Sequence, residues 1–230
     1  MKLPDKQCSI ESAIAKVKDG DTVMLGGFGV PGTPFMLIQA LVQHGARNLT
    51  IVKNDANEPG MGVDHLLQAG LVARLITTHL GLNAHAIGLM NSGAITVEFN
   101  AQGILAERIR AGGAGLGGVL SDIGIGTELA EGKQLVEQDG KTYLIEPALR
   151  ADVALLHEDR ADSFGNLAYV ATARNFNPLM AMAADCVIAE AEAMLPLGWL
   201  VPDDIHTTGV FVDHVATLGA LSKEYAVVQR

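Results

Sequence analysis

The chain has 230 residues, a length that suits one domain with a sizeable hydrophobic core. It carries 16 Lys and Arg against 26 Asp and Glu, and the resulting net charge of −10 argues against binding to nucleic acids or anionic membranes. Hydrophobic residues make up 49% of the chain, charged residues only 18%, and the mean hydropathy is +0.26, so disorder is excluded and part of the apolar surface is expected to lie against another subunit.

The first half of the chain alternates apolar runs with polar, glycine-containing loops. Ser9 is a candidate N-cap for a helix that ends near Gly20. The elements predicted after it are, in chain order, a strand over 22–25, a helix over 34–45, a strand over 49–52, a helix over 63–69 and a strand over 75–78. Strands that alternate with helices are typical of a parallel sheet covered by helices.

The second half of the chain is less regular. The predicted elements there are strands over 94–99, 141–147, 151–156 and 186–192, and helices over 103–111 and 174–185. We therefore expect an α/β fold with a mainly parallel sheet covered by helices and a smaller antiparallel portion around residues 140–157. No repeat, low-complexity tract or charge block divides the sequence, so residues 1–230 are expected to form a single domain.

Cysteine content and the N-terminal sequence are typical of a cytoplasmic protein. Cys8 and Cys186 are too few for a disulfide framework or a thiolate metal cluster, as a reducing cytosol permits. Asp5 and Glu11 come too early for a secretory signal, and no apolar run reaches the roughly 18 residues of a membrane span. We expect a cytoplasmic protein that binds no metal and no membrane.

The most informative stretch is the loop over residues 26–34. It contains four glycines between a predicted strand and a predicted helix, so its backbone N–H groups can approach an anionic or carbonyl oxygen closely. A tight turn is the alternative, although two glycines would suffice for one. The loop lacks the Gly-Lys-Ser/Thr ending of a nucleotide P-loop. Together with the loops over 53–62 and 78–86, it follows the carboxyl end of a strand, where such folds bind ligands.

A second glycine cluster, over residues 112–118, contains a G-x-G-x-x-G pattern at Gly113, Gly115 and Gly118. The cluster follows a helical pattern instead of a strand, and no helical pattern begins after it, so a dinucleotide site is not indicated. We expect a structural glycine loop beside a site or an interface.

Several polar residues have both a functional and a structural interpretation. His79 and His85 follow a predicted strand with no carboxylate at metal-ligand spacing, so we interpret His79 as a polar group lining a pocket, with a surface histidine as the alternative. The run over 157–159, His-Glu-Asp, resembles a ligand cluster, but because Arg160 flanks it we interpret it as a solvated turn. Gln102 is either a residue near a helix cap or an amide whose N–H stabilises a developing oxyanion.

An ordered series of residues resembles the class I CoA-transferases over nearly the whole chain. The series comprises residues 19–28 with Gly32 and Pro34, Asn54, Gln102-Gly103 with 105–115, and 173–177. It is most similar to the A (alpha) subunit of bacterial 3-oxoacid or acetate/acetoacetate CoA-transferases. The resemblance implies a sheet-based α/β fold shared with sugar-phosphate isomerases.

The resemblance also implies a reaction. Coenzyme A, a substrate and not a resident cofactor, would move between an acyl-CoA and a free acid such as acetoacetate or a short-chain fatty acid. In this family a glutamate attacks the thioester and forms first a mixed anhydride and then a glutamyl-CoA thioester. That glutamate lies in a Ser-Glu-Asn-Gly motif of the B (beta) subunit, and this sequence lacks the motif. The chain would thus be active only with a B subunit, in a heterotetramer.

Site residues follow from the same resemblance. Gln102 would stabilise the oxyanion. The substrate- and CoA-binding residues would be Gly26, Gly27, Phe28, Gly29, Gly32, Pro34, Asn54 and His79. His79 matches the acetoacetate-type bacterial subunits, which favours a small or medium acyl acceptor over a dicarboxylate. Ala101 and the residues 84–86 depart from the family pattern, which bears on the identity of that acceptor.

Other functions fit parts of the sequence. A ligand-binding or regulatory domain on the same scaffold, sensing a sugar phosphate or an acyl-CoA, would account for the absence of a self-sufficient catalytic set. A 3-oxoadipate-type CoA-transferase A subunit is the alternative within the family. An isomerase of phosphosugars would need paired acid and base residues, which no identifiable context supplies.

Overall fold

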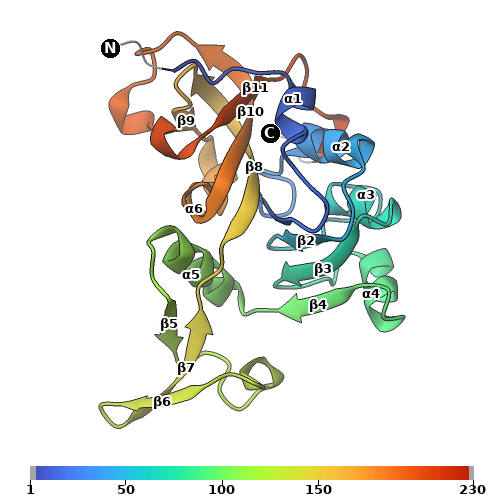
Figure 1. Ribbon diagram of the computed structural model, residues 1–230, viewed down its shortest axis with the longest axis vertical. Coiled ribbons are helices and arrows are strands. Elements are labelled where there is room, and N and C mark those ends of the chain that lie inside the picture. The colour runs from blue at the N-terminus through green and yellow to red at the C-terminus, as the bar shows by residue number, and fades with distance from the viewer. Residues whose placement is uncertain (1–3, 228–230) are drawn as a thin grey trace.

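The computed structural model describes residues 4–227 and is built around one long sheet, with helices on both of its faces (Figure 1). The strand order is β11-β10-β8-β1-β2-β3-β4, all neighbours along it are parallel, and β9 pairs antiparallel with β8. The strands of this sheet are β1 (Thr22–Leu25), β2 (Leu49–Val52), β3 (Val72–Thr77), β4 (Thr96–Phe99), β8 (Ala151–Asp162), β9 (Leu167–Ala168), β10 (Ala184–Leu195) and β11 (His214–Thr217). The predicted fold class is confirmed.

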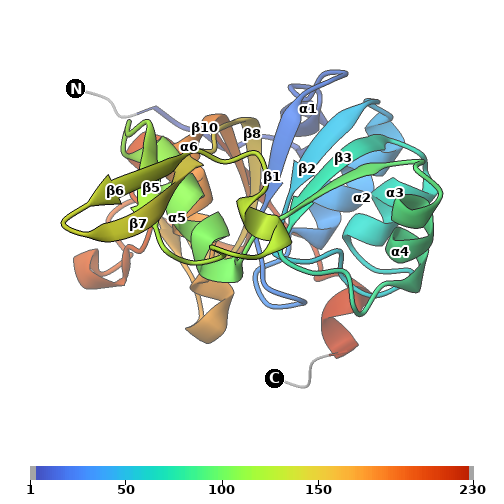
Figure 2. The same cartoon turned by 90° about the horizontal axis from the view of Figure 1, so that it is seen from below.

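Helices cover the two faces of this sheet as separate groups (Figure 2). One face carries α1 (Ile10–Ile14), α2 (Phe35–His44), α3 (Val63–Gln68) and α4 (Ala84–Asn91), and the other carries α5 (Gln102–Gly113) and α6 (Asn177–Ala183). Strand β1 supplies both cores, because Val23 and Leu25 pack toward the first group while Met24 packs toward the second. The short 3-10 helices are η1 (Glu128–Ala130), η2 (Ala171–Arg174), η3 (Pro202–Asp204), η4 (Gly209–Phe211) and η5 (Lys223–Val227).

Local signals in the sequence account for several helix ends. The Ser9 side chain caps α1 by accepting from the backbone N–H of Ser12, and Gly45 ends α2 with a φ of 78°. The prediction of a loop over 78–86 is wrong in its last residues, since α4 begins at Ala84. Asn83 caps this helix by accepting from the N–H of Ala86.

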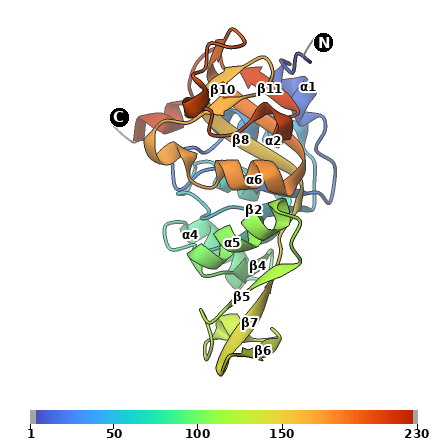
Figure 3. The same ribbon diagram turned by 90° about the vertical axis from the view of Figure 1, so that its left-hand side faces the viewer.

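A small antiparallel sheet projects from the body of the molecule (Figure 3). Its order is β5-β7-β6, and its strands are β5 (Gly118–Ser121), β6 (Leu135–Gln138) and β7 (Lys141–Pro147). The expected antiparallel portion around 140–157 is therefore confirmed for β7. It is wrong for residues 151–157, which lie in β8 between two parallel neighbours and are mostly buried, so that their apolar run belongs to the main core.

Large apolar side chains remain exposed on and beside the small sheet. They are Leu116, Leu120, Ile123, Ile125 and Leu135. Burial of this surface against another subunit stays a prediction. Within residues 4–227, no helix combines the length and the hydrophobicity that crossing a membrane requires.

Candidate active site

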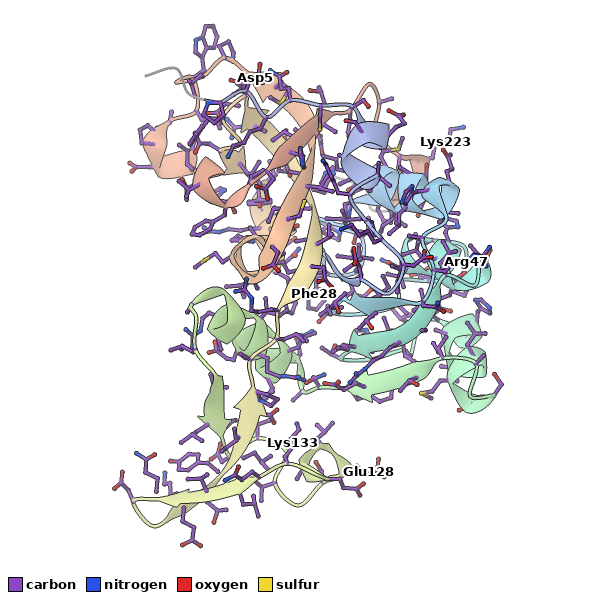
Figure 4. All side chains as sticks on the ribbon, in the orientation of Figure 1. Asp5, Phe28, Arg47, Glu128, Lys133 and Lys223 are labelled. Atoms are coloured by element: carbon purple, nitrogen blue, oxygen red, sulfur yellow. The ribbon has the colours of Figure 1, made fainter. Side chains whose placement is uncertain are left out.

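Polar groups from neighbouring strand ends meet at the carboxyl edge of the main sheet. Asn54 follows β2, Thr78 follows β3 and Gln102 follows β4. Gln102 Nε2 donates to Asn54 Oδ1 at 2.8 Å, and Thr78 Oγ1 donates to the Asn54 carbonyl oxygen at 2.7 Å. The loop over 26–34 follows β1 at the same edge, and its exposed Phe28 is labelled in Figure 4. The three predicted ligand loops, over 26–34, 53–62 and 78–86, thus converge, as parallel strand ends require.

Gln102 is placed by its helix and oriented by Asn54. It is the first residue of α5, and the preceding Ala101 is an N-cap without a side-chain hydrogen bond. The Gln102 side chain does not cap the helix either, because its amide donates a hydrogen bond to Asn54. Asn54 is fully buried whereas Gln102 is exposed, so the pair joins the interior of the protein to its surface.

Two asparagines near α6 hold the shape of the 26–34 loop. Asn175 Oδ1 accepts from the N–H of Gly27 at 3.2 Å, and its Nδ2 donates to the carbonyl oxygen of Pro31 at 3.0 Å. Asn177 Nδ2 donates to the carbonyl oxygen of Gly32 at 3.3 Å. The two asparagines were recognised in the sequence only as part of the family likeness, and the structure adds this contact with the glycine loop.

Close packing explains why glycine stands at two positions of this loop. A Cβ at Gly26 would lie 1.9 Å from Asn177 Oδ1, which no side chain could tolerate without displacement. Gly32 has a φ of +77°, and a Cβ there would lie 2.4 Å from the carbonyl oxygen of Ala173. The loop is therefore pressed against the segment that leads into α6.

A buried ion pair between Lys53 and Asp55 contacts the loop over 26–34. Lys53 is fully buried, and its Nζ lies 3.3 Å from Asp55 Oδ1. Asp55 accepts hydrogen bonds from the N–H of Gly29 at 2.8 Å, the N–H of Asn57 at 2.9 Å and Nδ2 of Asn54 at 3.0 Å. Burial by itself raises the pKa of Asp55, but the Lys53 ammonium and these donors outweigh it and lower the pKa to about 2.

Sequence reasoning missed this pair. The sequence predicted a site role for Asn54, but it placed Lys53 and Asp55 only in a polar loop. The available signal was a lysine directly after the buried strand β2, where a charge needs a partner close by in the sequence or in space.

The structure places the other predicted site residues in different surroundings. His79 is exposed, and its Nδ1 lies 3.1 Å from Thr78 Oγ1, so it stands at the edge of the cluster around Asn54. Its role in lining a pocket stays a prediction. Pro34 is buried as the N-cap of α2, which gives it a structural position at the end of the loop. His85 lies 2.8 Å through Nδ1 from Asp64 Oδ1 and is therefore tied to a carboxylate.

The interpretation of residues 157–159 as a solvated turn is wrong. They lie within β8, which continues to Asp162 because β10 pairs along its whole length. His157 and Glu158 are both buried, and His157 Nδ1 lies 2.9 Å from Glu190 Oε1. Across residues 4–227, no group of three or more His, Cys, Asp or Glu side chains is arranged to hold a metal ion.

The second glycine cluster is a packing feature. A Cβ at Gly112 would lie 2.2 Å from the carbonyl oxygen of Leu149, and one at Gly113 would lie 2.7 Å from Cβ of Met182. The cluster ends α5 and leads into β5, so it lacks the strand-to-helix turn of a dinucleotide site.

Glu98, on β4, precedes Gln102 in the chain and is occupied by two arginines. Its Oε1 accepts from Arg108 Nη1 at 2.5 Å, and its Oε2 forms an ion pair with Arg74. Burial raises the pKa of Glu98, but the hydrogen bonds and charge of Arg108, with smaller contributions from Asn100 and Arg74, lower it overall. Glu98 is thus a structural carboxylate that is not free to attack a substrate.

The fold and this cluster define an α/β protein that presents the side-chain amide of Gln102 at one sheet edge, a group suited to an oxygen that gains negative charge. The N–H groups of residues 26–29, which the sequence predicted to approach such an oxygen, are bound within the protein. The chain belongs to the coenzyme A transferase family, whose model matches residues 8–218. It is 50% identical over 211 residues to a probable coenzyme A transferase subunit alpha of Bacillus subtilis, covering 91% of this chain and 92% of that protein. It is 44% identical over 210 residues to the acetate CoA-transferase subunit alpha of Escherichia coli, covering 91% and 96%.

Solved structures agree with this assignment. An acyl-CoA transferase of E. coli O157:H7, in a thioester complex with CoA, matches with a TM-score of 0.84 and 25% identity over 96% of this chain and 48% of that one. Glutaconate coenzyme A-transferase of Acidaminococcus fermentans shares the fold with a TM-score of 0.85, at 19% identity over 97% and 78%. The recognition made from the sequence is confirmed.

Proposed function

We propose that this chain is the A subunit of a two-subunit CoA-transferase, which moves CoA between an acyl-CoA and a small carboxylic acid such as acetoacetate or a short-chain fatty acid. Coenzyme A is here a substrate. Relatives named for acetate, for succinyl-CoA:3-ketoacid and for 3-oxoadipate transfer are 44%, 44% and 43% identical to this chain, which supports a free carboxylic acid as the acceptor class.

The contact between Gln102 Nε2 and Asn54 Oδ1 carries this proposal. A side-chain amide has two N–H donors, and Asn54 occupies one of those of Gln102. The second N–H is the group that we assign to the substrate oxygen, which becomes negatively charged when the thioester or anhydride is attacked. In this proposal Gly26, Gly27, Phe28, Gly29 and Gly32 form one wall of the cleft. The exposed His79 and, behind it, the buried Asn54 lie on the side that receives the acid.

The nucleophile comes from the partner in this proposal. The sequence has no Ser-Glu-Asn-Gly motif, and Glu98 is held by two arginines. The relatives named above are alpha or A subunits, which supports a complex with a B subunit. We propose a heterotetramer in which the B subunit brings its reactive glutamate to the Gln102 side of this chain.

Mixing the chain with its cognate B subunit and measuring CoA exchange between an acyl-CoA and acetoacetate tests the proposal. The mixture should be active and each subunit alone inactive. In the complex, Gln102→Ala should lower kcat by about 10²–10³, the usual loss for one oxyanion donor, with little change in KM for the acyl-CoA.

Gln43→Ala is the matched control, because Gln43 is an exposed glutamine on α2. Its kcat should equal that of the wild type. Full activity of the chain without a partner would refute the shared-site proposal, and an unchanged kcat in Gln102→Ala would remove Gln102 from the oxyanion role.

A further inference from the structure

A buried charge stands behind the Asn54–Gln102 contact, and it has no role in the reaction described so far. Lys53 is 0% exposed, yet its Nζ lies near only two oxygen atoms among the described contacts, Asp55 Oδ1 at 3.3 Å and the Gly29 carbonyl oxygen at 3.4 Å. Removing a lysine from water is costly unless its charge is paired. An apolar residue could fill the same volume without this cost, so packing alone does not account for the pair of Lys53 and Asp55.

Asp55 connects this charge to the amide of Asn54. Asp55 Oδ2 accepts from Asn54 Nδ2 at 3.0 Å, and Asn54 Oδ1 in turn accepts from Gln102 Nε2 at 2.8 Å. An ionised carboxylate only accepts hydrogen bonds, so the nitrogen of Asn54 must face it. The oxygen of Asn54 must then face Gln102, and the nitrogen of Gln102 must face Asn54.

The direction of this hydrogen-bond chain decides which atom of Gln102 lies beside Asn54. With Asp55 ionised, the Gln102 nitrogen and its second N–H lie where the strand ends converge. If Asn54 turned its amide over, the Gln102 carbonyl oxygen would take that place, and it would repel an oxyanion instead of stabilising it. Lys53 favours the charged form of Asp55 and thereby the productive direction.

We propose that Lys53 and Asp55 are positioning residues, which set the orientation of the Asn54 and Gln102 amides so that Gln102 offers an N–H to the reacting oxygen. This inference rests on the proposed function of Gln102. The buried ion pair thus acts on the reaction through Asn54 and Gln102 and does not contact the substrate itself.

Asp55→Asn is the sharpest test, because it keeps the shape of the side chain and removes the acceptor-only character. In the complex with the B subunit, kcat should fall about tenfold, the equivalent of one net hydrogen bond, while KM for the acyl-CoA stays within about twofold. In the Gln102→Ala background the same substitution should have no further effect, since there is no amide left to orient. A purely structural role would instead multiply the two losses.

A second measurement does not depend on activity. The side-chain NH₂ signals of Gln102 in ¹⁵N-labelled chain can be assigned by their loss in Gln102→Ala. They should shift in Asp55→Asn and in Lys53→Met. Lys133→Met is the matched control, because Lys133 forms an ion pair with Glu146 at 2.8 Å beside the projecting small sheet, far from Phe28 in Figure 4, and it should leave these signals in place.

The outcomes separate this inference from the proposed function. A wild-type complex without transferase activity would refute the proposed function, and the Gln102 signals would still report on the hydrogen-bond chain. Signals unchanged in both Asp55→Asn and Lys53→Met would overturn the positioning role. Multiplicative losses of kcat in the double variant would do the same.

Discussion

Replacing Glu158 with Gln should make the protein more stable at neutral pH. Glu158 is fully buried on β8, and neither of its carboxyl oxygens has a hydrogen-bond partner. Burial, reinforced by the nearby charge of Glu190, raises the pKa of Glu158 well above its ordinary value of 4.5. Burial likewise raises the pKa of the neighbouring Tyr169, so this phenol stays neutral.

The pH dependence follows from the proton that Glu158 retains. Above pH 4.5 the unfolded chain releases this proton while the folded chain keeps it, so the free energy of unfolding falls as pH rises. The slope is about 1.4 kcal/mol per pH unit until the group ionises in the folded state as well. The Gln side chain does not titrate, so the free energy of unfolding of Glu158→Gln lacks this pH dependence. Above pH 4.5, the gain in stability of Glu158→Gln over the wild type should therefore grow by about 1.4 kcal/mol per pH unit as long as Glu158 stays protonated in the folded chain.

Urea unfolding of wild type and variant at several pH values measures this difference. Glu137→Gln, an exposed substitution on β6, controls for the loss of one negative charge and should run parallel to the wild type. Parallel curves for Glu158→Gln and the wild type between pH 5 and pH 6 would refute the reasoning. Glu158 would then be ionised in the folded protein and paired in a way that the geometry does not show.

Two further substitutions test how the glycine loop is held. Gly26→Ala should destabilise the chain by about 1–3 kcal/mol because its Cβ would meet Asn177 Oδ1, whereas Gly88→Ala on α4, with open space around it, should not destabilise it; equal unfolding midpoints for the two variants would contradict the clash. Tyr225→Phe should lower the free energy of unfolding by about 1 kcal/mol, because the buried Tyr225 hydroxyl donates to the Thr33 carbonyl oxygen; an unchanged urea midpoint would contradict this.

The first half of the fold could be predicted because its signals are local. Short apolar runs became β1 and β2, Gly45 ended α2, and the loops after the strands met at one sheet edge because parallel strands place their carboxyl ends together. This rule placed the loop that contains Asn54 at the predicted ligand-binding edge, whereas Gln102 entered the predicted site through the resemblance to the CoA-transferases. It did not predict their hydrogen bond, which depends on side-chain direction.

The rest depended on contacts that no local pattern shows. A solvated turn was predicted for His157 and Glu158 because a charged run flanked by Arg160 is typical of a loop, and only the pairing of β8 with β10 explains their burial. The small sheet was only partly predicted, because β5 and β6 are short, contain no buried residue and lack the apolar alternation of a half-buried strand. The ion pair of Lys53 and Asp55 is invisible without knowing that both are buried.

The position of β1 has a consequence for the growing polypeptide. Val23 pairs with Val153 and Leu25 with Leu155, so one side of this strand waits for a segment that is made 130 residues later. During translation, β1 to β4 can associate while the outer backbone groups of β1 stay without their final partner. Such an open edge invites pairing with other chains until β8 emerges and closes it. Among the neighbouring strands of the main sheet, β1 and β8 in its middle are therefore the pair whose second strand is made after the longest delay.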